Sequence, residues 1–250
     1  MFKNLFRWLR QLKGRPRSRL YKYTNRTATV LGVAYLLLIF FPSSLFAWHV
    51  QVGEFRVYSD RHIPAGIDEV IGRAVTKLET SPFYSGTETF DLYIANDAWR
   101  RTLLNPRGAR AFGGALALTG NTILNRADIE KDQIHNDQPT YNQRPLHQVI
   151  AHECTHQMLA RNYGLIRYLC LPTWKNEGYC EFVAGDSTIP LNDAPTLLRK
   201  ANPDPPPAIR YAEYHLAVRE CLVGRRMSVD DFFEDDVKFE EVLAAALAGR

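Results

Sequence analysis

Three residues able to bind a metal and transfer protons stand together in "VIAHECTHQMLARN", residues 149–162. His152 and His156 are four positions apart, so on a helix their side chains lie on one face about one turn apart. Their nitrogens can then bind one zinc ion at about 2.0–2.1 Å. Glu153 projects about 100° further round the helix, where its carboxylate can take a proton from metal-bound water. The spacing predicts a hydrolytic zinc site, and the alternative is an ordinary helix that matches by chance.

A catalytic zinc ion needs a third protein ligand and an open position for water. The metzincin continuation requires Gly and His three and six residues after His156, but Leu159 and Asn162 stand there. Glu177, in "LPTWKNEGYCEFVAG" (residues 171–185), is the candidate. Two histidines and one glutamate form a catalytic zinc set, so one Zn²⁺ per chain is expected.

"HECTH" followed by "WKNEGYCE" resembles the gluzincin metallopeptidases of the peptidase MA-like superfamily. Their pattern is HExxH, then a second helix that carries Asn-Glu-Gly. The resemblance implies a zincin-like fold, with His152, His156 and Glu177 as zinc ligands and Glu153 as the general base. It also implies that Glu181 orients a zinc-bound histidine from behind, a support that ligating imidazoles generally need.

The family also contributes a Tyr or His that stabilises the tetrahedral oxyanion. "RYAEYHLAVRECL" (residues 210–222) resembles the tyrosine-bearing helix of the aminopeptidase branch and aligns Tyr211 with that tyrosine; Tyr214 and His215 are alternatives. "GGALAL" (residues 113–118) takes the place of the strand that lines the substrate cleft, where an extended peptide could add a strand. Elsewhere only the order of elements matches, and endo- versus exopeptidase action stays open.

The elements that must position these residues follow from hydrophobic periodicity and breaker residues. Strands are expected over residues 52–60 and 90–97, and two short strands within residues 111–125. Helices are expected over residues 65–80, 97–104 and 209–223. Three further helices are expected to begin after Pro145, near Trp174 and after an N-cap at Ser228. Residues 126–144 are polar and predict a loop. Because strands come first and helices second, an α+β domain over residues 52–250 is expected.

The first 48 residues predict a membrane anchor. Nine Lys and Arg and no acid precede residue 28, which leaves 22 basic against 27 acidic residues in the rest. Residues 28–48 carry no charge, and as a helix they would span roughly 30 Å, the thickness of a bilayer core. This favours a cytoplasmic tail (1–27), one transmembrane helix (28–48) and an extracytoplasmic catalytic domain, periplasmic or extracellular. The alternatives are a cleaved signal peptide and a buried helix.

Partners follow from the same distribution. Attraction to anionic lipid headgroups accounts for the basic tail, so no nucleic-acid partner is expected. Cys154, Cys170, Cys180 and Cys221 permit disulfides in an oxidising compartment, but their pairing stays open.

Together these features predict a membrane-anchored zinc metallopeptidase that cleaves a peptide or protein substrate. The first alternative is a non-catalytic zincin-like binding module tethered to the membrane. The second is a zinc hydrolase that acts on a non-peptide bond, because the ligand set does not specify the bond.

Overall fold

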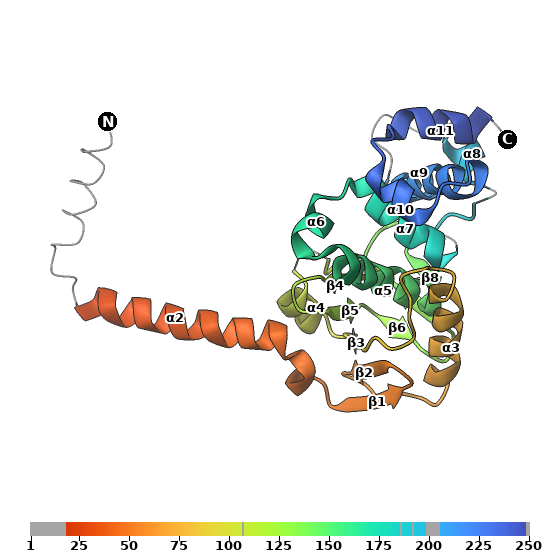
Figure 1. Ribbon diagram of the computed structural model, residues 1–250. Coiled ribbons are helices and arrows are strands. Elements are labelled where there is room, and N and C mark those ends of the chain that lie inside the picture. The colour runs from red at the N-terminus through yellow and green to blue at the C-terminus, as the bar shows by residue number, and fades with distance from the viewer. Residues whose placement is uncertain (1–18, 107, 186, 192, 199–205, 249–250) are drawn as a thin grey trace, which may run out of the picture. The chain divides into compact units, whose positions relative to one another are not determined.

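A computed structural model describes residues 19–106, 108–185, 187–191, 193–198 and 206–248 (Figure 1). Residues 1–18 of the predicted basic tail lie outside the described residues. The chain divides into two compact units, Met1–Pro42 and Ser43–Arg250.

The predicted transmembrane helix over residues 28–48 is wrong. Helix α2 (Arg19–Phe40) stops at Phe40, and Pro42, which has no backbone N–H to donate, begins a 3₁₀ turn. The helical part of the uncharged run, residues 28–40, would cover only roughly 20 Å of a bilayer core of roughly 30 Å. In the described part of the chain no helix combines the length and the apolar character that crossing a membrane requires. This finding also overturns the predicted single-pass location with an extracytoplasmic domain.

The second unit is built on a mixed five-stranded sheet of order β1-β2-β3-β5-β4. Its strands are β1 (Trp48–Val52), β2 (Phe55–Ser59), β3 (Phe90–Ile94), β4 (Gly113–Leu116) and β5 (Asn121–Leu124). Strands β2, β3 and β5 run parallel, while β1 and β4 are antiparallel edges. Helices α3 (Ile67–Leu78) and α4 (Ala98–Leu104) lie between these strands in the chain. The expected class, an α+β zincin-like domain behind a membrane helix, is thus corrected to a mixed α/β chain.

The predicted loop at residues 126–144 instead holds a small antiparallel sheet, β6-β7-β8. Its strands are β6 (Ala127–Asp128), β7 (Gln133–His135) and β8 (Gln143–Pro145). Strands of two or three residues are too short to show the alternation of apolar and polar residues that predicts a strand. The sequence therefore predicted a loop here. The sheet leads directly into the next helix, because the N–H groups of Leu146 and His147 donate to the carbonyl and carboxylate oxygens of Asp132.

Helices form the rest of the second unit (Figure 1). They are α5 (Leu146–Tyr163), α6 (Leu165–Cys170), α7 (Thr173–Ala184), α8 (Ala194–Leu198), α9 (Pro207–Arg219), a π-helical turn (Glu220–Gly224), α10 (Val229–Glu234) and α11 (Phe239–Ala248). In Figure 1, α5 lies between the sheet and the helices α7 and α9. Residues 149–159 of α5 are all buried, polar ones included, and buried polar groups need partners.

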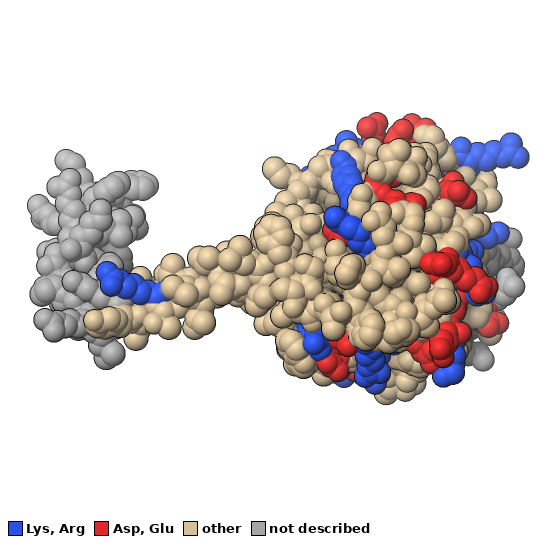
Figure 2. Space-filling view, turned by 90° about the horizontal axis from the view of Figure 1, so that it is seen from below, with Lys and Arg blue, Asp and Glu red and all other residues tan. Residues whose placement is uncertain are grey.

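Among the described residues, charged side chains of both signs are interspersed on the face seen in Figure 2, without a continuous basic area. Elsewhere in the described chain, Lys and Arg side chains form ion pairs, such as Arg56–Asp91 at 2.5 Å and Lys131–Asp128 at 2.7 Å. Phosphate backbones bind to groups of Lys and Arg that act together, and the described residues of this face show no such group. The absence of a nucleic-acid partner stays a prediction.

Gly178 sets how closely α7 approaches α9. A Cβ atom there would lie 2.6 Å from the carbonyl oxygen of Tyr214 and 2.6 Å from Cγ2 of Val218. We expect Gly178→Ala to lower the free energy of unfolding by about 1–3 kcal/mol, because the two backbones must separate. Urea unfolding measures this. The control is Gly72→Ala, because no atom lies within 4 Å of a Cβ atom built there. This variant should raise the free energy of unfolding by about 0.5–1 kcal/mol, since alanine favours a helix over glycine. Equal midpoints in the two variants would contradict the prediction.

Candidate metal centre

Two histidines and one carboxylate form a triangle of donor atoms between α5 and α7. The Nε2 atoms of His152 and His156 are 3.2 Å apart. Oε2 of Glu177 lies 3.4 Å from the first and 3.3 Å from the second. A tetrahedral zinc ion with bonds of about 2.0–2.1 Å separates its ligand atoms by about 3.3–3.4 Å. The triangle therefore has the size that a tetrahedral zinc site requires.

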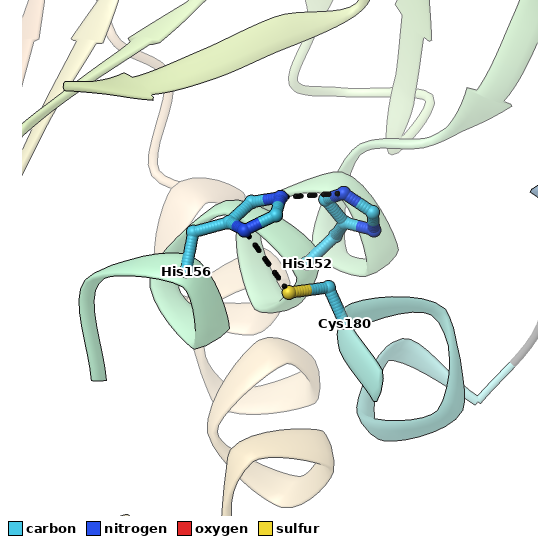
Figure 3. Close-up of side chains that lie close together, drawn as sticks. All are labelled: His152, His156 and Cys180. Atoms are coloured by element: carbon cyan, nitrogen blue, oxygen red, sulfur yellow. Dashed lines mark hydrogen bonds between the residues drawn. The ribbon is translucent and has the colours of Figure 1, made fainter. Parts of the chain in front are cut away.

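Cys180 is a competing donor. His152, His156 and Cys180 can place one donor atom each within 4.8 Å of one another, and all three are buried (Figure 3). The sulfur, however, lies 3.3 Å from Nδ1 of His156, whereas Glu177 contacts Nε2 of both histidines. Burial raises the pKa of the Cys180 thiol well above its usual range, which favours the neutral form. Glu177 is thus better placed than Cys180 to complete a site that uses Nε2 of both histidines.

The ring of His156 is held from behind by residues that the sequence did not single out. Its Nδ1 lies 3.1 Å from Oδ1 of Asn176 and 3.2 Å from the hydroxyl of Tyr168. In the tautomer with hydrogen on Nδ1, this N–H can donate a hydrogen bond to Oδ1 of Asn176, which leaves the lone pair of Nε2 for a metal. Asn176 directly precedes Glu177, so its place in the motif was a usable signal; Tyr168, on α6, carried none.

Glu181 lies beside Nδ1 of His152, on the far side of the ring from the triangle; its orienting role stays a prediction. Its Oε1 is 3.2 Å from Nδ1 of His152, an ion-pair distance outside ordinary hydrogen-bond geometry. Burial by itself would lower the pKa of His152, but Glu181 and Glu177 raise that pKa to about 10. A metal ion bound to His152 would place positive charge beside the same two carboxylates, Glu177 and Glu181. Burial would likewise raise the pKa of Glu181, yet Arg144 and His152 lower it to about 2.

Glu153 is buried beside the triangle but is not part of it. Burial raises the pKa of its carboxyl, and the carboxylate accepts a hydrogen bond from the backbone N–H of Ala115 in β4. The edge strand comes this close because it begins with glycine. A Cβ atom at Gly113 would lie 2.8 Å from the carbonyl oxygen of Ile123 and 3.5 Å from Oε1 of Glu153. The raised pKa and this position suit a general base.

Of the three candidates for oxyanion stabilisation, the structure brings Tyr211 to the site. The centroids of the Tyr211 and His152 rings are 6.2 Å apart. Burial raises the pKa of Tyr211 well above its usual range, so its hydroxyl keeps its proton and can donate it in a hydrogen bond. Tyr214 packs against Phe239 at 5.3 Å between ring centroids, and His215 is buried in the helical core.

The four cysteines are all free thiols. Cys154, Cys180 and Cys221 are buried and Cys170 is exposed. The disulfides that the even number of cysteines permitted are therefore absent between them.

Neither models of known protein families nor curated proteins match this chain when compared with it. The gluzincin resemblance accordingly stays a prediction that rests on "HECTH" and "WKNEGYCE". Whatever function is assigned must come from the chemistry of the side chains in the metal centre.

Proposed function

We propose that this protein is a zinc-dependent hydrolase of the gluzincin type that cleaves peptide bonds. The observation that carries the proposal is the triangle of Nε2 of His152, Nε2 of His156 and Oε2 of Glu177, with sides of 3.2–3.4 Å. The buried carboxylate of Glu153 beside it supplies the acid–base group that a hydrolase needs.

His152, His156 and Glu177 would hold the zinc ion. Bound there, zinc would lower the pKa of a water molecule and polarise the scissile carbonyl group. Glu153 would accept the proton of the attacking water and transfer it to the leaving amine. The hydroxyl of Tyr211 would donate a hydrogen bond to the oxyanion as negative charge develops on it.

A peptide is the substrate that the neighbouring strand favours. Strand β4 is the outer strand of its sheet, and Gly114 pairs with Ile123 of β5. The N–H of Asn125 donates to the carbonyl of Phe112 at 2.8 Å. Since hydrogen-bonded positions alternate along an antiparallel pair, the main-chain groups of Gly113 and Ala115 face away from β5. The N–H of Ala115 already donates to Glu153. An extended peptide could pair with the carbonyl of Ala115 and the main-chain groups of Gly113, and its backbone would then lie beside Glu153.

Metal analysis and a cleavage screen test the proposal. We expect the purified full chain to bind one zinc ion and to cleave members of a peptide mixture, with the products identified by mass spectrometry. A chelator should stop cleavage, and added zinc should restore it. A chain that holds zinc but cleaves no peptide would favour the non-catalytic binding module. Activity only on other bonds would favour the non-peptide hydrolase.

Replacing Tyr211 by Phe tests the oxyanion donor. We expect kcat for peptide cleavage to fall by about 10²–10³-fold, the usual effect of losing one such donor. Zinc content should not change, because the hydroxyl is not a ligand. Tyr214→Phe is the matched control and should cleave at the wild-type rate. Equal rates for the two variants would rule out this role for Tyr211.

A further inference from the structure

One buried ion pair connects the small sheet to the helix that carries Glu177. Nη1 and Nη2 of Arg144, in β8, donate to Oε1 and Oε2 of Glu181, in α7, at 2.9 and 3.0 Å. The exposed fractions of these side chains are 5% and 1%. Removing two charges from water carries a desolvation penalty of several kcal/mol per ion, and apolar replacements of a buried pair are often neutral or stabilising. Stability alone is therefore a poor reason for this pair.

A second neighbour of Glu181, His152, suggests another role for the ion pair. Oε1 accepts from Arg144 and also lies 3.2 Å from Nδ1 of His152. Because a guanidinium group binds both carboxylate oxygens in one plane, it prevents the carboxylate from rotating. Oε1 is then held 3.2 Å from Nδ1, on the side of the imidazole ring opposite the triangle. The ring of His152 is thereby kept with Nε2 toward Nε2 of His156 and Oε2 of Glu177.

Contacts of its strand and of its guanidinium group hold Arg144 in position for the ion pair with Glu181. Arg144 pairs with Ile134 of β7, and the guanidinium lies 6.0 Å from the centroid of the Phe112 ring. The small sheet and the segment before β4 thus fix the position of the charge. Through Glu181 they are connected to His152 on α5.

We propose that Arg144 is a positioning residue of the metal centre, acting through Glu181 to orient His152 for metal binding. The inference rests on the proposed function only in that the same three residues bind a metal. It requires neither turnover nor a peptide substrate.

The test compares zinc affinity with stability, using competition with a chromophoric chelator and urea unfolding of the full chain. The main variant is Arg144→Met/Glu181→Leu, which removes both charges and keeps similar volumes. We expect it to be as stable as wild type or more so, yet to bind zinc about 10–100-fold more weakly, as loss of an outer-shell partner does. Arg144→Lys keeps the positive charge but not the planar guanidinium group. Its zinc affinity should lie between that of wild type and that of Arg144→Met/Glu181→Leu.

The control is Arg56→Met/Asp91→Leu, which removes another arginine–carboxylate pair with two hydrogen bonds, a more exposed one between β2 and β3. Its zinc affinity should equal that of wild type. The inference is overturned if Arg144→Met/Glu181→Leu folds and binds zinc as wild type does, or if wild type binds no zinc. Tight zinc binding by wild type without any peptide cleavage would defeat the proposed function and leave this inference intact.

Discussion

Glu153→Gln is expected to bind zinc as tightly as wild type and to cleave peptides about 10²–10⁴-fold more slowly in kcat. Glutamine has nearly the same shape, and its amide oxygen can still accept the hydrogen bond from Ala115. It cannot accept the proton of the attacking water. Since Glu153 lies outside the triangle of donor atoms, the metal should stay. Steady-state kinetics and metal content on the same sample measure both quantities.

The matched control is Glu69→Gln, which neutralises an exposed carboxylate on α3 and should leave kcat and metal content unchanged. If Glu153→Gln cleaved peptides at the wild-type rate, Glu153 would not be the base. If the variant kept a biological function that depends on the metal, the non-catalytic binding module would be the better description.

The second large effect is expected at the third ligand. Glu177→Ala should weaken zinc binding by more than the roughly 10–100-fold that loss of an outer-shell partner causes, because a direct ligand is lost. Cleavage should disappear with the metal. Cys180→Ser should keep both, since Sγ contacts Nδ1 of His156 and not the nitrogen that faces Glu177. Equilibrium dialysis of the two variants against zinc measures the difference.

The reverse result would be equally informative. If Cys180→Ser lost the metal and Glu177→Ala kept it, the ion would be bound by His152, His156 and Cys180. The triangle with Glu177 would then not be the zinc site, and the proposed hydrolase would lose the observation that carries it.

The parts of the site that repeat with the period of a helix could be predicted from the sequence. His152 and His156 are four residues apart on α5, and Glu177 and Glu181 are four apart on α7. Each pair shares one face of its helix because residues four apart lie about one turn apart. The packing of α7 on α5 then brings the two pairs together. Their chemical roles stay predictions, since position does not establish metal binding or turnover.

Contacts between distant segments could not be read from the sequence in the same way. The resemblance aligned Tyr211 with the tyrosine of the family and kept Tyr214 and His215 as alternatives, because the packing of α9 on α7 determines which ring faces His152. Arg144 lies in a segment read as a loop, and its role depends on a carboxylate 37 residues away. Such pairings have no local period to detect.

The amino terminus shows the same division most clearly. Residues 28–48 form an uncharged, largely apolar run, but hydropathy measures composition and does not show where a helix ends. Pro42 interrupts the run, and Trp48 begins β1, where it pairs with Ser59. The sequence alone therefore determined the local helical geometry of the "HECTH" motif. Tertiary structure decided which segments became helix or strand and which side chains surround the motif, because those choices depend on partners far along the chain.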